Sequence, residues 1–456
     1  MPTLVDHLLP TDLAALVRMQ AEGRKVWLVG GALRDHFLEL KQPDLDLAVE
    51  DRAIPLARGL ADALGVPYYV LDEKRDAARV MLPGRATLDL ARLRASTIEE
   101  DLRLRDFSIN ALAVDLDDPE HLIDPLGGLQ DLKDRILRAC ASDSIERDAI
   151  RSLRAARLAV GLTLQLEAQT KEQIRLSAGV LSNCAAERKR DELSKMLDHP
   201  GAATSMRLMR RLDLLQSVLP EQAELESDAW NHTLRIVDGL SEVMGAVVEN
   251  FELEGTGNLP LAELTLHLGR FRTALGEHLA TTIRGGHRSI QMLVLAALYT
   301  EVAHPHRVAY QRVRELRFSE AEAARVRTIA GYRNRAVDLE TEMTDLGAHR
   351  YFRDCGAVGV EAALLYLASS FARSLPQETW ELKLRVVQQL FGAWFENRRR
   401  IVEPPRLLRG DELEAELNLV PGPVIGEMLA AIAEGQVEGK IESAEQALEF
   451  ARQRIS

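Results

Sequence analysis

Two carboxylates one residue apart follow a glycine turn near the start of the sequence, and together they could hold a metal ion. The stretch reads VWLVGGALRDHFLELKQPDLDLAVE, residues 26–50. On a strand, Asp44 and Asp46 would point to the same face, because side chains alternate along a strand. Two carboxylates on one face repel each other, and such a pair suits Mg²⁺ that bridges to nucleotide phosphates. The spacing therefore predicts a Mg²⁺ site with Asp44 and Asp46 as ligands.

The turn before these carboxylates has the features of an anion site. Residues 26–29 form a short apolar run that predicts a buried strand. Gly30–Gly31 breaks the strand and lets another group approach the backbone closely. Apolar residues then recur at helical spacing from Ala32, and Pro43 is expected to stop the helix. The first amides of that helix would face an anion, and Arg34 lies in its first turn, where a phosphate would sit.

Each half of this pattern alone has an ordinary explanation. A Gly-Gly turn is commonly a plain loop, and an Asp-x-Asp pair is commonly a solvated strand edge. The conjunction of strand, Gly-Gly, Arg and Asp-x-Asp within 25 residues is much rarer, and it favours a nucleotide site.

Further polar residues follow on later predicted strands. Asp89, in TLDLARL, has apolar neighbours at alternate positions, and this third carboxylate could complete a metal site or orient a hydroxyl nucleophile. The segment LRLRDFSINALAV places Arg105, Asp106 and Asn110 where they could contact a sugar or a phosphate. The segment IDPLGGLQDL is expected to be structural rather than catalytic.

An acidic residue and three arginines recur every three residues in RDAIRSLRAARLAV, residues 147–160. They are Asp148, Arg151, Arg154 and Arg157, which on a helix would form one polar stripe. An Asp and an Arg side by side offer an acceptor and a fork of donors, which can match the Watson–Crick edge of a base. The alternative is a salt-bridged face in contact with solvent.

Length and composition limit the class of protein. With 456 residues, several domains are expected, and a hydrophobic content of 46% is normal for a globular chain. We expect no membrane-spanning run and no signal peptide. The three cysteines are few and far apart, which fits a reducing, cytoplasmic compartment. The net charge of −13 argues against broad, nonspecific nucleic-acid binding and leaves room for a local basic surface.

The periodicity changes along the chain and predicts an α+β head followed by an all-α remainder. Strand and helix signals alternate only up to about residue 140, so the head is expected to be a small mixed sheet with helices. Helical periodicity then continues to the end, with a break at Gly255–Gly257 among others. We divide the chain into a head (1–140), a neck (141–200), a helical body (201–400) and a small helical tail (401–456).

These motifs together resemble the class II tRNA nucleotidyltransferases of the polymerase-β-like superfamily. The family's first motif is matched by Gly30, Gly31, Arg34, Asp35, Asp44 and Asp46, the second by Arg105, Asp106, Asn110 and Ala111, and the fourth by Asp148, Arg151, Arg154 and Arg157. Leu104 and Arg147 depart from it, replacing an Arg and a Glu. Residues 124–132 match the third motif and 187–197 the fifth, a helix expected to brace the nucleotide pocket.

The resemblance implies a reaction and a role for each residue. The chain would add C and/or A residues from CTP and ATP to the 3′ end of tRNA without a template, and release pyrophosphate. Gly30–Gly31 and Arg34 would hold the triphosphate, and Asp44 and Asp46 would hold Mg²⁺. Base selection would fall to Asp148 and Arg151, whereas Arg105, Arg154 and Arg157 would contact the nucleotide. No membrane is implied, and no protein partner can be inferred.

Three alternatives to a full CCA-adding enzyme are open. A bacterial poly(A) polymerase would carry a Gly-Arg-Arg-Phe-like element after the Asp-x-Asp strand, and this sequence lacks one. A CC-only enzyme is suggested by the short segment RLRASTIEED, residues 92–101, where many relatives have a flexible lever. The last alternative is a noncatalytic RNA-binding protein.

The predicted body resembles a degenerate HD-type domain. WNHTLRIVDGL, with His232, is similar to the first metal-binding segment of such domains. Thr300–Glu301 stands where a His-Asp pair is expected, and AGYRNRAV lacks the later histidines. We therefore expect a helical RNA platform without phosphohydrolase activity.

Overall fold

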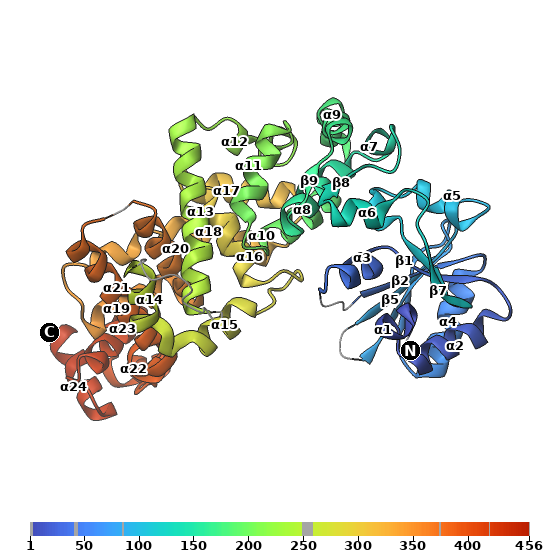
Figure 1. Ribbon diagram of the computed structural model, residues 1–456. Coiled ribbons are helices and arrows are strands. Elements are labelled where there is room, and N and C mark those ends of the chain that lie inside the picture. The colour runs from blue at the N-terminus through green and yellow to red at the C-terminus, as the bar shows by residue number, and fades with distance from the viewer. Residues whose placement is uncertain are drawn as a thin grey trace. The chain divides into compact units, whose positions relative to one another are not determined.

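The computed structural model describes residues 3–40, 44–83, 86–248, 259–373, 375–418 and 420–455 (Figure 1). These residues form two compact units. The first comprises Met1–Cys184 and Leu208–Ser217, and the second Ala185–Arg207 and Val218–Ser456. The predicted helix stop at Pro43 and the predicted break at Gly255–Gly257 lie outside the described residues.

A mixed seven-stranded sheet forms the centre of the first unit, in the order β3-β4-β5-β2-β1-β6-β7. The strands are β1 (Val26–Val29), β2 (Asp44–Val49), β3 (Tyr68–Asp72), β4 (Ala77–Met81), β5 (Thr87–Arg92), β6 (Ala113–Asp115) and β7 (Asp118–Ile123). Only β2 and β5 pair in parallel, and the other neighbours are antiparallel. The predicted α+β head with a small mixed sheet is confirmed.

The helices around this sheet are α1 (Leu4–Leu8), α2 (Thr11–Ala21), α3 (Gly31–Phe37), α4 (Ala53–Leu64), α5 (Ile98–Arg103), α6 (Gly128–Lys133), α7 (Ser144–Arg147), α8 (Ile150–Gly161) and α9 (Ala168–Ser177). α4 packs on β4 and β5 through a buried stripe at Leu56 and Leu60, which have helical spacing. α3 ends at Phe37, earlier than the apolar pattern predicts.

Burial of β1 and β2 explains how the sheet presents the carboxylates. All four residues of β1 are buried, as an apolar central strand requires. On β2, Leu45 and Leu47 are buried, whereas Asp44 and Asp46 lie on the other face and are exposed. A hydrophobic cluster that includes Trp27, Leu102 and Ala111 ties the second motif to these strands.

One short strand pair joins the end of the predicted head to the predicted neck. β8 (Ile136–Leu137) pairs in parallel with β9 (Gln165–Leu166), which follows α8. The four-part division of the chain stays a prediction, and the structure places the boundary between its two units within residues 141–200, at Cys184 and Ala185.

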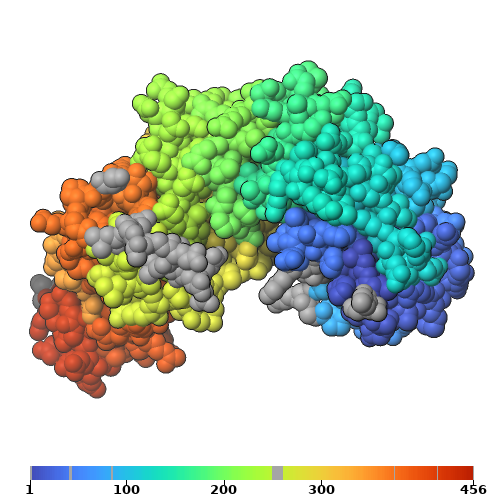
Figure 2. Space-filling model, in the orientation of Figure 1, coloured from blue at the N-terminus to red at the C-terminus, as the bar shows by residue number. Residues whose placement is uncertain are grey.

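The second unit is helical throughout its described residues. Its helices are α10 (Ala186–Leu197), α11 (Ala202–Arg211, shared with the first unit), α12 (Pro220–Ala223), α13 (Ser227–Val247), α14 (Leu259–Leu268), α15 (Arg272–Ala280), α16 (Ser289–Ala297), α17 (Pro305–Glu315), α18 (Glu320–Tyr332), α19 (Asp345–Cys355), α20 (Gly359–Phe371), α21 (Gln377–Phe391), α22 (Gly410–Leu417), α23 (Pro423–Val437) and α24 (Ala444–Ile455). The last three form a small lobe with its own core, drawn in red in Figure 2. Ion pairs from Arg350 and Arg353 on α19 to Glu434 on α23 attach this lobe.

One helical run corrects the expectation that no segment could span a bilayer. Residues 345–371, which include α19 and α20, are long and apolar enough by length and composition. In the structure, 67% of the apolar window is buried inside the protein. The run also contains Glu361, which is fully buried and paired with Arg325 and His278. These contacts are those of a central helix of the second unit.

Candidate active site

The three predicted carboxylates lie on two adjacent parallel strands. Asp46 on β2 is directly opposite Asp89 on β5, and Asp44 is opposite Thr87. The Thr87 hydroxyl donates a hydrogen bond of 2.7 Å to Asp44 Oδ1. Because residues in register on neighbouring strands share a face, the sheet brings all three carboxylates to one surface. The prediction of a third carboxylate beside the pair is confirmed as geometry.

The electrostatics of Asp46 show how much negative charge is concentrated at this surface. Its side chain is exposed on the face of the sheet, yet the surrounding protein removes part of the water from its carboxylate. Desolvation first, and then the charge of Asp89, raise the pKa of Asp46 from 3.8 to about 6, against the opposing effect of Arg105. A cation placed here would relieve the repulsion among the carboxylates.

Asp89 is held by an arginine that the sequence analysis did not single out. Arg79 on β4 is opposite Asp89 in the antiparallel β4–β5 pair. Its Nε and Nη2 donate hydrogen bonds of 2.7 and 2.8 Å to the two carboxylate oxygens of Asp89. This contact partly neutralises Asp89 and fixes its orientation. Asp44 and Asp46, in contrast, make no ion pair with an arginine among the residues of the head that the structure describes.

Gly30 lies where the first and second motifs meet. Its backbone has φ 78° and ψ −133°, a conformation that essentially only glycine adopts. A Cβ placed on Gly30 would lie 3.2 Å from Arg105 Nη1 and 3.5 Å from Asp46 Oδ2. A Cβ placed on Gly31 would lie 3.4 Å from Arg34 Nη2. Two guanidinium groups therefore flank the glycine turn, as a site for phosphates requires.

Arg34 is oriented by its neighbour and by the second motif. It makes a bidentate pair with Asp35, with hydrogen bonds of 2.6 and 2.7 Å. Its Nη1 donates a hydrogen bond of 2.6 Å to Asn110 Oδ1. The predicted site residues Arg34 and Asn110 are thus in direct contact, although 76 positions separate them in the chain.

Asp106 extends this network to the neck. Asn110 Nδ2 donates to one oxygen of Asp106 at 3.0 Å, and Arg154 Nη1 on α8 donates to the other at 2.9 Å. Burial alone would raise the pKa of Asp106. The charge of Arg154 and hydrogen bonds from Asn110, Arg154 and the Phe107 amide outweigh burial and hold the pKa below its usual range. Asp106 therefore acts as an ionised bridge between the head and α8.

The predicted stripe of Asp148 and the arginines on one helix is wrong in one respect. α8 begins at Ile150, and Asp148 lies before it in an extended conformation, as the residue that ends α7. Arg151, Arg154 and Arg157 do lie on α8, each half-buried. The helix-face argument for pairing Asp148 with Arg151 therefore does not hold, because the chain bends between them.

The contacts of Arg151 hold protein segments together. Its guanidinium donates to the backbone carbonyls of Leu104 and Arg105 at 3.0 Å each and to Ser144 Oγ at 2.6 Å. Desolvation lowers the pKa of Arg151. These bonds fasten α8 to the loop that carries the second motif. Arg147, in the place of the family's Glu, instead forms an exposed ion pair with Asp143.

The third motif is structural. Asp124 accepts hydrogen bonds from the amides of Gly128 and Leu129 and so caps the start of α6. A Cβ on Gly128 would lie 2.1 Å from the Ser108 carbonyl oxygen, so only glycine fits this close approach. The fifth-motif segment forms α10, which belongs to the second unit, and its expected bracing of the nucleotide stays a prediction.

The carboxylates fit a metal that brings other ligands with it. Within the described parts of the chain, no three His, Cys, Asp or Glu side chains are grouped closely enough to hold a metal ion by themselves. Mg²⁺ does not need such a group, because it is commonly bound by one or two carboxylates together with substrate phosphates and waters. Asp44 and Asp46, beside an arginine-flanked turn, match that requirement.

Comparison with known proteins gives consistent matches along the chain. Residues 26–138 match the family described as "Poly A polymerase head domain", and residues 163–226 match "Probable RNA and SrmB- binding site of polymerase A". The A-adding tRNA nucleotidyltransferase of Deinococcus radiodurans is 32% identical over 435 residues, which cover 93% of this chain and 94% of that protein. The CC-adding tRNA nucleotidyltransferase of Thermus thermophilus is 30% identical over 438 residues, 92% of each chain.

A solved structure supports the same fold. The Thermotoga maritima CCA-adding enzyme, complexed with tRNA, superposes with a TM-score of 0.64 at 21% identity, over 99% of this chain and 98% of that one. At this identity the likeness concerns the fold alone.

Proposed function

The chain belongs to the class II tRNA nucleotidyltransferases, and on this premise we propose that it adds C and/or A residues from CTP and ATP to the 3′ end of tRNA. No nucleic-acid template is used, and pyrophosphate leaves. The observation that carries the proposal is the single surface formed by Asp44, Asp46 and the glycine turn, with Arg34 and Arg105 beside that turn. We place the reaction in the cytoplasm, where tRNA and nucleoside triphosphates meet.

Asp44 and Asp46 are the residues that would hold Mg²⁺. A bound Mg²⁺ would supply positive charge to offset the charge of the triphosphate and the charge that develops on the attacking 3′-oxygen. Desolvation raises the pKa of Asp46 to about 6, with a smaller contribution from the charge of Asp89, and a bound cation would stabilise the ionised carboxylate against both effects. Asp89 lies opposite Asp46 and is fixed by Arg79, so it is suited to orient a hydroxyl group rather than to bind the ion.

The glycine turn and its arginines would bind the triphosphate. Gly30 and Gly31 carry no side chain, so phosphate oxygens can approach the backbone closely. Arg105 extends along Gly30 and is steadied by Asp101 at 3.3 Å. Arg34 is fixed by Asp35 and Asn110. In-line transfer of a nucleotidyl group depends chiefly on such positioning, with little covalent chemistry left to the protein.

Base selection would combine residues of the neck. Asp148 offers an acceptor for the exocyclic amino group that both CTP and ATP carry, and UTP lacks that group. We propose that Arg151 braces this region through the Leu104 and Arg105 carbonyls, and that it contacts a base only if these bonds open. Arg154 and Arg157 are the remaining nucleotide contacts on α8.

Addition of CC only is the second candidate, and one observation favours it. Residues 92–101 are not only short but also tied at both ends. The backbone amide and Nε of Arg94 donate to Asp101 Oδ1 at 3.0 Å, and Asp101 is buried. A segment closed by this pair has little freedom to swing when the substrate changes from CTP to ATP.

A product analysis tests both candidates. We would incubate two tRNAs, one lacking CCA and one ending in CC, with each nucleoside triphosphate separately and with all of them, and sequence the ends. Addition of CC alone to the first tRNA supports the second candidate. Addition of A from ATP to both tRNAs, after CC on the first, supports full CCA addition. A long A tail would identify a poly(A) polymerase. Loss of all products in Asp44→Ala and Asp46→Ala variants that still bind tRNA is expected, and retained activity would refute the site.

A further inference from the structure

The second unit contains a cavity at the place of the degenerate HD segments. Three segments compared above with HD metal-binding segments contribute residues to its lining. They are Ile236, one turn beyond His232 on α13, Thr300–Glu301 after α16, and Arg333–Asn334 after α18. The cavity has a volume of about 350 Å³, which is in the range of small-molecule sites.

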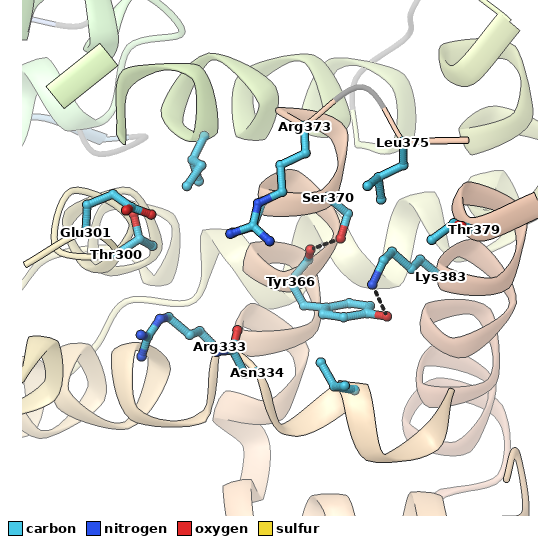
Figure 3. A pocket seen from close by; sticks show the side chains of 13 residues that line it. Thr300, Glu301, Arg333, Asn334, Tyr366, Ser370, Arg373, Leu375, Thr379 and Lys383 are labelled. Atoms are coloured by element: carbon cyan, nitrogen blue, oxygen red, sulfur yellow. Dashed lines mark hydrogen bonds between the residues drawn. The ribbon is translucent and has the colours of Figure 1, made fainter. Parts of the chain in front are cut away.

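Positive groups dominate the lining of this cavity, which we call the body cavity (Figure 3). Its charged residues are Arg333, Arg373, Lys383 and Glu301. Hydroxyl and amide groups complete the polar lining: Thr300, Asn334, Tyr366, Ser369, Ser370 and Thr379. In Figure 3, Arg373 and Lys383 extend toward the cavity from the end of α20 and from α21. The lining thus holds three cations and one carboxylate, and a second carboxylate, Glu340, lies against Lys383 just outside it.

The carboxylates near the body cavity are already engaged. Glu301 Oε1 lies 2.9 Å from His232 Nδ1. Glu340 accepts a hydrogen bond of 2.8 Å from Lys383, whose Nζ also lies 3.1 Å from the Tyr366 hydroxyl. Arg373, in contrast, is exposed and makes no ion pair with any residue that the structure describes. One guanidinium is therefore available to an anion, and Lys383 and Tyr366 form a fixed polar wall beside it.

Arg333 adds a second guanidinium that is costly without an anion. One of its nitrogens donates to the Ala330 carbonyl at 2.9 Å. Desolvation lowers the pKa of Arg333, and only the charge of Glu301 opposes this effect. A partly buried guanidinium gains most from a doubly charged oxyanion, because both of its edges can then form charge-assisted hydrogen bonds.

A metal ion does not fit the body cavity. Among the described residues, Glu301 in the lining and His232 beside it are the potential ligands, fewer than the three or four protein ligands of a transition-metal site. The surrounding cations would repel a divalent ion. The lining therefore favours an anion over a cation.

We propose that the body cavity binds a small phosphate monoester, such as a nucleoside monophosphate, without a metal ion, through Arg333 and Arg373. Arg333 and Arg373 offer charge-assisted donors to a dianionic phosphate, and the hydroxyl groups offer further donors to its oxygens. The volume admits a phosphate with an attached sugar. The cavity lies in the second unit and not in the head, so this proposal does not depend on the proposed transfer reaction.

The test is a calorimetric titration of the full chain with inorganic phosphate and with AMP, in EDTA so that no metal-dependent site contributes. The wild type is expected to bind AMP saturably. The Arg333→Gln/Arg373→Gln double variant should bind at least about tenfold more weakly, because two charge-assisted contacts are lost. The matched control Arg385→Gln/Arg399→Gln removes two exposed charges that do not line the cavity, and Arg105→Gln weakens only the head. Both controls should bind AMP as the wild type does.

A variant that keeps the charge guards against a folding artefact. Arg333→Lys/Arg373→Lys should retain part of the affinity that the Gln variant loses, with an unchanged melting temperature in each case. The proposal is overturned if the wild type binds neither probe, or if the head variant Arg105→Gln loses AMP binding instead. It is also overturned if the Gln double variant leaves AMP binding intact and weakens tRNA binding about tenfold, since the arginines would then serve RNA phosphodiesters.

Discussion

Arg79 on β4 and Asp89 on β5 are joined by two hydrogen bonds of 2.7 and 2.8 Å, directly beside Asp46. The pair divides the three carboxylates of the head into two classes. Asp89 is compensated by a guanidinium, whereas Asp44 and Asp46 are the proposed ligands of Mg²⁺. This division predicts unequal effects of replacing each carboxylate.

The first prediction compares Asp89→Asn with Asp46→Asn. Asp46→Asn should slow nucleotide addition at least about 1,000-fold, because it removes a proposed metal ligand. Asp89→Asn should cost only about 10- to 100-fold, since Asp89 orients a hydroxyl group. Single-turnover rates at saturating CTP measure both, and Arg79→Gln serves as the control for loss of the pair. Equal losses for Asp46 and Asp89 would show that Asp89 is also a metal ligand.

The second prediction concerns stability and pH in the absence of metal. The pKa of Asp46 is raised from 3.8 to about 6, so ionised Asp46 destabilises the folded state above pH 6, and this cost disappears as the pH falls toward 4. Asp46→Asn should therefore raise the melting temperature at pH 8 in EDTA, by an amount that shrinks between pH 6 and pH 4. Melting curves across this range give the measurement. Asp62→Asn, an exposed carboxylate on α4, is the matched control, and a gain for Asp46→Asn that persists at pH 4 would contradict the assignment.

The third prediction separates the two residues proposed for base selection. Arg151→Ala should lower the free energy of unfolding by about 2 kcal/mol, because it leaves backbone carbonyls of the second-motif loop without a donor. Asp148→Ala should instead change the preference for CTP over UTP with little loss of stability. Denaturant unfolding and competition kinetics distinguish the effects. Should Arg151→Ala fold normally and lose only selectivity, the carbonyl contacts would be secondary and Arg151 would read the base.

Alternation and helical spacing were sufficient to predict the surface that carries the carboxylates. The period of two in residues 44–49 placed Asp44 and Asp46 on one face, and the structure confirms the strand. The position of Asp89 opposite Asp46 depends on strand order, which no local pattern contains. Its identification as a third carboxylate came instead from its apolar neighbours.

The sequence pattern did not predict two features of the site. One depends on the register between strands, and the other on a bend that no proline or glycine marks. Arg79 could be recognised only once residues 77–81 and 87–91 were paired in the right register, which brings it opposite Asp89. The chain leaves the helical conformation at Asp148, with φ −153° and ψ 93°, although no proline or glycine marks the position. The three-residue spacing therefore predicts one helix face for Asp148 and Arg151, although the chain bends between them.

The fourth prediction tests the degenerate body. His232 is paired with Glu301, and Arg333 stands near the same cavity, so the protein should show no metal-dependent phosphatase or cyclic phosphodiesterase activity with Ni²⁺ or Mn²⁺. Release of phosphate from a chromogenic phosphate ester is the assay, with the chain and its His232→Ala variant side by side. Hydrolysis by the wild type that the variant lacks would show that the site still binds a catalytic metal.

The last prediction rests on the contact between the two head motifs at Gly30. Gly30→Ala introduces a Cβ about 3.2 Å from Arg105 Nη1, at a backbone conformation with φ 78° and ψ −133°. Gly65→Ala is the matched control, because Gly65 also has a positive φ, of 66°, but nothing within 4 Å of its Cβ position. Both should lose about 1 kcal/mol or more of stability from backbone strain. Only Gly30→Ala should also weaken the binding of CTP, by about tenfold, because it displaces Arg105 from the turn where the triphosphate is proposed to lie. Equal CTP affinity in the two variants, measured where both are folded, would mean that Arg105 and the glycine turn do not form one phosphate site.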